Sequence, residues 1–115
     1  MSYDLQICVK VEGADYYPPI AYPDYDHPTY NLRDMFVKCM DWEYVQGNIY
    51  KCSGIIGNVE RGINELETKR AKYTKYNPPN GWGNIDSALK ALVSLKNCIY
   101  ETAEYIPIEH LYMRW

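Results

Sequence analysis

The sequence predicts a single α+β domain over residues 1–115, with the order strand, three helices, strand. Three observations lead to this fold class. Apolar and polar residues alternate near the start, a period of two that indicates a half-buried strand. Three later segments carry apolar residues at helical spacing, and a short alternating segment follows them. A chain of 115 residues also has the usual size for one hydrophobic core.

The first strand is predicted over residues 3–11, because every odd position there is apolar. Gly13 ends this strand. Residues 14–30 contain four prolines and five tyrosines, and so many prolines exclude a helix or a central strand. A loop this long and aromatic is more often functional than a simple connector, so we expect it to take part in binding.

Two helices are predicted next. The first begins at Asn31, whose side chain suits an N-cap, and runs to about residue 42. The second spans residues 52–69, where apolar residues recur every three or four positions. It contains three glycines, which lower its helix propensity and allow close packing of another helix: Gly54, Gly57 and Gly62.

The third helix follows Gly83 and has Asn84 as its expected cap. Its apolar stripe is the strongest in the chain and consists of Ile85, Ala88, Leu89, Leu92, Leu95, Ile99 and Ala103. After Pro107, residues 108–115 are predicted to form the second strand, with Leu111, Met113 and Trp115 on one face.

Two strands alone make a marginal sheet, which has consequences for assembly. We expect the two terminal strands to pair with each other in a small sheet packed on the helices. An exposed sheet edge invites pairing with another chain. The sequence therefore also predicts a homo-oligomer in which a second copy covers this edge.

Composition limits which cellular compartments and which classes of partner we expect. The four cysteines form no Cys-x-x-Cys pair and three lie on predicted apolar faces, so free, buried thiols in a reducing compartment are expected. The first residues lack a signal-peptide pattern, and no stretch approaches the ~20 apolar residues of a membrane span. We expect a cytoplasmic protein. A net charge of −3 argues against direct nucleic-acid binding.

Two segments are candidate ligand sites. Residues 29–33 enter a helix, where free backbone amides, the helix dipole and Arg33 suit an anionic ligand. In residues 77–84, Trp82 lies between two glycines just before another helix and could stack on a planar base. Two structural alternatives stay open: an ordinary helix cap followed by a solvated arginine, and a tryptophan that covers the core.

Other polar groups give weaker signals. Residues 69–76 carry four cations and two tyrosines, a composition of single-strand nucleic-acid surfaces, although cations are also favoured at a helix C-terminus. Residues 24–27 offer three possible metal ligands without a fourth. No Ser/His/Asp spacing is recognisable. We therefore expect no metal, no cofactor and no enzymatic activity; the residues through which catalysis would remain conceivable are Glu60, Cys39 and His27.

Several motifs resemble a family of small uncharacterised proteins of bacteria and their phages. These are Thr-Tyr-Asn-Leu at residues 29–32, Glu-Arg-Gly-Ile at 60–63, Asn-Gly-Trp-Gly at 80–83, and Arg114. The similarity covers about the whole of residues 1–115. Many bacterial members have a histidine where this chain has Tyr30, so no role of that histidine carries over, and the tyrosine-rich form resembles the phage type.

The resemblance implies an arrangement and a role. It implies that Tyr30 and Asn31 lie beside residues 80–84, with a pocket for a small polar molecule between them. Small acidic phage proteins often counter host immunity. The resemblance therefore implies a counter-defence function in the host bacterial cytoplasm, by association and not by chemistry.

The first functional hypothesis is a non-enzymatic binder that sequesters a small nucleotide-like immune signal. Its expected ligand-binding residues are Tyr30 and Trp82 for stacking, Arg33 and Arg114 for phosphate, and Asn31 and Asn84 for polar edges.

The alternative is an acidic inhibitor that blocks a host defence nuclease complex such as a CRISPR effector. It would act through Asp24, Tyr25 and Asp26 in the proline-rich loop. Residues 1–45 hold eight acidic and three basic side chains, which favours a basic partner surface. A small hydrolase or transferase is the third possibility.

Overall fold

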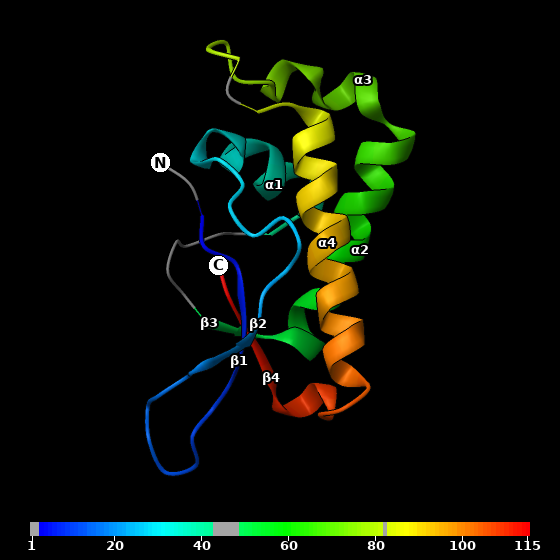
Figure 1. Cartoon of the computed structure of the whole chain (residues 1–115). Coiled ribbons are helices and arrows are strands. Elements are labelled where there is room, and N and C mark those ends of the chain that lie inside the picture. Colours follow the sequence, from blue (N-terminus) through cyan, green and yellow to red (C-terminus); the bar gives the residue numbers. More distant parts are fainter. Residues whose placement is uncertain (1–2, 43–48, 82) are drawn as a thin grey trace.

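The two terminal strands pair at the centre of the sheet, as predicted. The computed structural model describes residues 3–42, 49–81 and 83–115 (Figure 1). Strand β1 (Gln6–Val9) runs antiparallel to β4 (Leu111–Arg114), with Ile7 opposite Met113. Residues directly opposite each other share a face of the sheet. Ile7 and Met113 are both buried, and their face is turned toward the helices.

Two further strands, which sequence analysis missed, extend this pair on both sides. Strand β2 (Pro19–Ala21) lies beside β1 and β3 (Ile49–Lys51) lies beside β4, so the sheet order is β2-β1-β4-β3. The β1–β2 register shifts between Ile7 and Cys8. Proline and a register irregularity both suit an edge strand. Each terminal strand thus has a neighbour from its own chain on both sides; the oligomeric state stays a prediction.

The first helix differs in detail from the sequence prediction. A 3₁₀ turn, η1 (Tyr30–Leu32), precedes α1 (Arg33–Met40). Thr29 caps this turn, because its side chain accepts a hydrogen bond from the Asn31 amide, so the assignment of the cap to Asn31 is wrong. The helix ends at Met40, earlier than predicted, because Asp41 adopts a left-handed conformation with φ of 50°.

The remaining helices follow their predicted stripes closely. Helix α2 (Cys52–Thr68) leads into the short α3 (Arg70–Tyr73) and a 3₁₀ turn, η2 (Thr74–Tyr76). Helix α4 (Ile85–Ala103) begins at its predicted cap, Asn84. The last strand begins later than predicted, because the three residues after Pro107 form a 3₁₀ turn, η3 (Ile108–His110).

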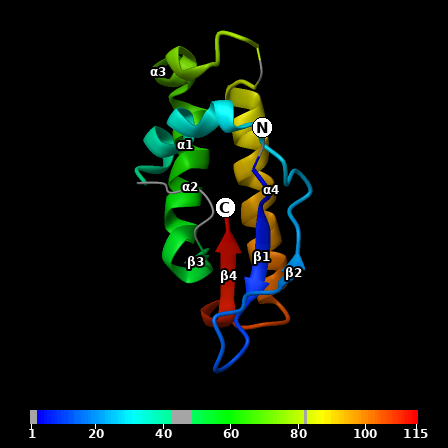
Figure 2. The same ribbon diagram turned by 90° about the vertical axis from the view of Figure 1, so that its left-hand side faces the viewer.

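Helices α2 and α4 form a layer behind the sheet, whereas α1 crosses them on the same side as the sheet (Figure 2). Figure 2 shows β1 and β4 in front of α2 and α4. The centre of the core is a close helix crossing: a Cβ added to Gly62 would lie 2.8 Å from Leu92 Cδ1 and 2.9 Å from Met40 Cγ. By contrast, a Cβ on Gly57 would meet nothing within 4 Å. Of the three glycines in α2, only Gly62 is required by packing.

Side chains of α2 complete the end of α1. Arg61 donates to the Cys39 carbonyl at 2.6 Å, and Asn58 donates to the Met40 carbonyl at 3.0 Å. The last carbonyls of a helix lack intrahelical partners, so these two bonds stabilise the C-terminus of α1.

All four cysteines are free and buried, in agreement with the expected thiols. Cys8 is buried even though it lies opposite Tyr112, on the face of the sheet that was expected to be polar. Among the described residues, no helix has the length and apolar character required to cross a membrane.

Candidate functional site

The two predicted ligand segments meet in space. A Cβ added to Gly83 would lie 2.8 Å from the Thr29 methyl carbon and 3.1 Å from Leu32. Gly83 also has a φ of 99°, a conformation that side chains other than glycine rarely adopt. The turn that enters η1 therefore packs directly on the backbone that enters α4. We call this contact the helix-entry junction (residues 29–33 and 83–84).

Three of the predicted ligand-binding residues line this junction from the η1 side. Tyr30 is half-buried, and its ring packs edge-on against Tyr3 with centroids 4.5 Å apart. Asn31 is exposed, and its side chain donates to Thr29 Oγ1 at 3.2 Å. Arg33 is exposed, with a nitrogen 3.5 Å from an Asp34 carboxylate oxygen. Tyr30 is thus held in place, whereas Asn31 and Arg33 face solvent.

The α4 side of the junction is largely satisfied by the chain itself. Asn84 Oδ1 accepts from the Ser87 amide at 2.9 Å, and Asn77 Oδ1 accepts from the Ile85 amide at 3.1 Å. Asp86 adds a negative charge in the first turn, where the helix dipole favours it. An anion at this helix N-terminus would compete with these groups, so the α4 amides are a poor phosphate site.

The other two predicted ligand residues are Trp82 and Arg114. Trp82 lies outside the described residues. Arg114 lies on β4, where its two terminal nitrogens donate to Gln6 Oε1 at 2.8 Å and to the Tyr17 carbonyl at 3.2 Å. Arg114 is therefore bound to the sheet and to the start of β2, and its guanidinium stabilises the fold locally.

Large apolar side chains are exposed on the β1–β2 hairpin and directly after it. Val11, Tyr16, Ile20 and Tyr22 are 40, 61, 43 and 55% exposed. Val11 and Tyr16 lie on the segment that joins the two strands, which extends away from the helices at the lower left of Figure 1, whereas Ile20 lies in β2 and Tyr22 follows it. Its charged residues are mostly acidic, with only Lys10 positive. We call the following exposed residues the hairpin surface: Val11, Glu12, Asp15, Tyr16, Ile20, Tyr22 and Asp24.

Of the predicted inhibitor residues, Asp24 belongs to the hairpin surface, and Tyr25 and Asp26 follow it on a segment that contacts α4. The Ser94 hydroxyl lies 3.3 Å from both the amide nitrogen and the carbonyl oxygen of Tyr25, and Lys90 Nζ lies 4.9 Å from the centre of the Tyr25 ring. These contacts hold Tyr25 against α4. Asp26 is half-buried, with its carboxylate 3.3 Å from His27 Nε2. Only Asp24 of the three is exposed, beside a polar hollow of about 60 Å³.

Two cations of the basic segment 69–76 face a buried carboxylate that sequence analysis missed. Glu65 is almost fully buried; Lys69 Nζ lies 2.8 Å from it, Lys72 Nζ lies 3.6 Å away and the Tyr73 hydroxyl donates to it at 2.7 Å. Hydrogen bonds from Lys69 and Tyr73 lower the pKa of Glu65 to about 2. Burial and the bond to Glu65 raise the pKa of Tyr73 to about 12.

This cluster makes a single-strand nucleic-acid surface a poor description of the segment. A third cation, Arg70, forms an ion pair with Asp86 at 2.8 Å. Lys69, Lys72 and Arg70 are therefore already paired with carboxylates, and their ion pairs connect the start of α3 to α2 and α4. The sequence signal for Glu65 was its place three residues after Gly62, on the apolar stripe of α2.

The three candidate catalytic residues each contact other groups of the fold. Cys39 is buried, its thiol lies 3.7 Å from the Phe36 carbonyl, and burial raises its pKa to about 12, so it stays protonated at neutral pH. Glu60 accepts a hydrogen bond from Tyr100 at 2.5 Å. His27 Nδ1 lies 2.8 Å from an Asp4 carboxylate oxygen. Within the described ranges, no group of three or more histidine, cysteine or acidic residues could hold a metal ion.

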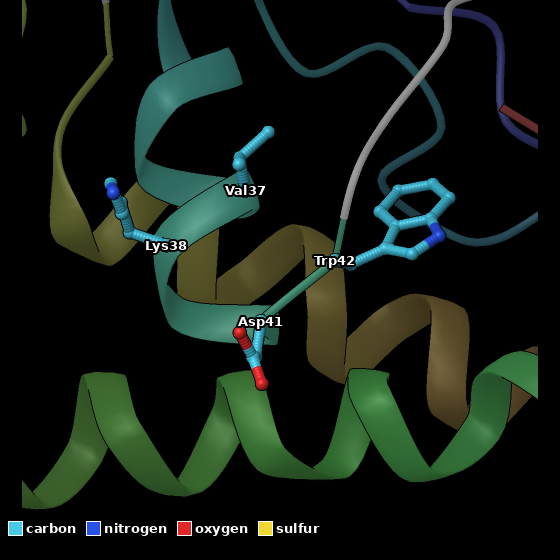
Figure 3. A pocket seen from close by; sticks show the side chains of 4 residues that line it. All are labelled: Val37, Lys38, Asp41 and Trp42. Atoms are coloured by element: carbon cyan, nitrogen blue, oxygen red, sulfur yellow. The ribbon is translucent and has the colours of Figure 1, made fainter.

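A larger pocket, of about 360 Å³, lies at the C-terminal end of α1. Figure 3 shows Val37, Lys38, Asp41 and Trp42 around it. The described residues that line it come from the second half of α1 and from the two residues that follow this helix.

No protein-family model, curated protein or solved structure matches the chain. The function therefore has to be inferred from the geometry of its surfaces.

Proposed function

We propose that this chain is a non-enzymatic binding protein whose hairpin surface docks on a basic face of a partner protein. One observation carries the proposal: within the short stretch of residues 11–22, four large apolar side chains are exposed, and the same stretch carries exposed acidic residues. Clustered exposed apolar groups with a polar rim are typical of interaction sites.

The chemistry of these side chains fits a protein partner. Tyrosine gives a large contact area at a low entropic cost, so Tyr16 and Tyr22 are suited to anchor a complex. Glu12, Asp15 and Asp24 are exposed on the same stretch of chain and give it a net negative charge, which accelerates encounter with a basic surface and disfavours acidic partners. The phage-type resemblance suggests a host defence nuclease, for example a CRISPR effector, as this partner.

The test compares proteins retained from a bacterial lysate by the immobilised wild type and by the double variant Tyr16→Ala/Tyr22→Ala. We expect the wild type to retain a basic, nucleic-acid-binding protein that the variant loses, with an affinity decrease of about 2 kcal/mol or more for two anchors. Raising the salt concentration should weaken retention, because the acidic rim acts through screened charges.

Tyr105→Ala is the matched control. Tyr105 is 85% exposed but lies after α4, outside the hairpin surface. Its replacement should leave retention unchanged. Equal retention by wild type and the double variant would contradict the proposal, as would retention of acidic proteins only.

The helix-entry junction supports a second candidate, sequestration of a small nucleotide-like signal. The specific observation is the contact of Gly83 with Thr29 and Leu32, which brings Asn31 and Arg33 near the start of α4. Calorimetry with cyclic and linear nucleotides at low and high salt tests it. If Arg33 meets phosphate, Arg33→Ala should cause a salt-sensitive loss of affinity; absence of binding to wild type would reject this candidate.

A further inference from the structure

Two residues of β4 hold the base of the hairpin from the neighbouring strand. Arg114 donates to the Tyr17 carbonyl at 3.2 Å, while its other terminal nitrogen donates to Gln6 at 2.8 Å. Two residues earlier, the Tyr112 ring packs edge-on against the Tyr17 ring, with centroids 5.1 Å apart. Residues of β4 thus contact Tyr17 through both its backbone and its side chain, two residues before β2 begins.

The hairpin has backbone supports at its base and near its tip. At the base, the Val9 amide donates to the Pro18 carbonyl at 3.2 Å. Beyond β1, backbone bonds run from the Val11 amide to the Tyr16 carbonyl at 2.9 Å and from the Ala14 amide to the Val11 carbonyl at 3.1 Å. Val11 and Tyr16 are themselves exposed. Burial therefore contributes little to order in this segment, and its position depends on how firmly its base is fixed.

From these contacts we infer that Arg114 is a positioning residue, which pre-organises the hairpin surface for its basic partner. This inference rests on the proposed function. A guanidinium presents several donors in a rigid fork, so two of its nitrogens can bind β1 and Tyr17 at once, whereas the single nitrogen of a lysine would have to reach both acceptors. A hairpin fixed before binding loses less conformational freedom in the complex, and its affinity is correspondingly higher.

The direction of the change in binding distinguishes a positioning role of Arg114 from a simple charge effect. The hairpin surface is acidic, and Arg114 is a cation at its base. If Arg114 acted only through its charge, neutralising it would strengthen attraction to a basic partner. If it positions the hairpin, neutralising it weakens binding instead, because only the ordered fraction of the molecules is competent.

The first part of the test needs no partner. Amide hydrogen exchange is compared between wild type, Arg114→Gln and Arg114→Lys, with Lys51→Gln as the matched control. Lys51 is exposed and lies opposite Tyr112 in the same sheet. We expect exchange of the Val11 amide to rise about tenfold in Arg114→Gln, the factor that corresponds to one charge-assisted hydrogen bond. Arg114→Lys should show most of this increase, and Lys51→Gln none.

Amides of α4 report global stability and should keep their protection in all variants. Unchanged exchange at Val11, or an equal increase at Val11 and in α4, would overturn the inference whether or not a partner exists. The second part measures the basic proteins retained from the same bacterial lysate. Arg114→Gln should retain several-fold less than wild type, as expected when the competent fraction falls, and Lys51→Gln should retain as much or more.

The outcomes separate the two proposals. A looser hairpin with equal or stronger retention by Arg114→Gln overturns the positioning inference and leaves the hairpin surface in place. A looser hairpin in Arg114→Gln, with no basic protein retained by wild type, rejects the proposed function alone, since Arg114 would still have been shown to fix the hairpin.

Discussion

The α2–α4 crossing and the hairpin surface differ in how their side chains are used. At the crossing, Gly62 and Leu92 are buried at a contact so close that one added methyl group would overlap its neighbours. On the hairpin, Tyr16 and Tyr22 are more than half exposed, and a few backbone hydrogen bonds and β4 contacts hold the segment in place. Both regions contain large apolar side chains, but these side chains are buried at the crossing and exposed to solvent on the hairpin.

This difference separates stability from recognition within one small domain. Burial of apolar area is the main favourable term in folding, so substitutions at the crossing should act mainly on the free energy of unfolding. Substitutions on the hairpin should act mainly on binding. Four experiments can sharpen or break this division.

The largest effect on stability is expected for Leu92→Ala. Leu92 is fully buried at the centre of α4, so its truncation leaves a cavity and should cost ~2–5 kcal/mol of unfolding free energy. Urea denaturation followed by far-UV circular dichroism measures this cost. A loss below ~1 kcal/mol, the range of ordinary surface changes, would mean that the crossing is not the stabilising centre.

Gly62→Ala comes next. Its new methyl group would lie within 3 Å of atoms from Leu92 and Met40, and such overpacking should cost ~1–3 kcal/mol. The control is Gly57→Ala in the same helix, where a Cβ meets nothing within 4 Å and should stabilise the protein by ~0.5–1 kcal/mol. Opposite signs for the two substitutions support the close crossing; equal signs would contradict it.

Glu65→Gln should change how stability depends on pH. The pKa of Glu65 falls from its ordinary value of 4.5 to about 2 in the folded protein, mainly through the hydrogen bond from Lys69. The ionised carboxylate therefore stabilises the fold fully above about pH 4.5, and this contribution is lost as the pH falls toward 2.

Urea denaturation between pH 2 and 7 would reveal this linkage. Glu65→Gln should be less stable than wild type at pH 7, and the difference should shrink steadily below pH 4.5. Glu67→Gln, an exposed neighbour on α2, serves as the control and should follow the wild-type curve. A constant difference across the whole range would show that the Glu65 cluster contributes no ionic stabilisation.

The smallest effect on stability is expected for Tyr16→Ala, which should stay within ~0.5 kcal/mol of wild type because the side chain is 61% exposed. Denaturation and retention of basic proteins should be measured on the same preparation. The division predicts an unchanged denaturation midpoint and reduced retention. A large loss of stability would show that the hairpin belongs to the folding core.

The sequence was sufficient for the fold class and for the helices with strong apolar periods. The stripe of α4 and the cap at Asn84 follow from side-chain spacing and local hydrogen bonding, which a sequence displays directly. Strands β2 and β3 were missed because each has only three residues, too few for a period of two to be visible, and β2 begins with a proline.

The candidate site was harder to predict, because it depends on contacts between distant segments. Thr29 and Asn31 are both good caps, and only the geometry of η1 decides between them. Arg114 was expected to meet phosphate, whereas β-pairing brings it to Gln6 and to Tyr17. The acidic character of the loop was visible in its composition. The sequence did not show that Asp24 is exposed while the next residue, Tyr25, is half-buried against α4.

The central position of β4 has a consequence for how the chain folds. Gln6 and Arg114 are 108 positions apart, yet they pair in the middle of the sheet, and β3 reaches β1 only through β4. Closing so long a loop is entropically costly and slows folding. During synthesis, the helices and the local β1–β2 pair can form before β4 leaves the ribosome, whereas β1 and β3 cannot be joined in one sheet until β4 lies between them. The sheet, and with it the anchor of the hairpin, is therefore expected to be the last part of the molecule to assemble.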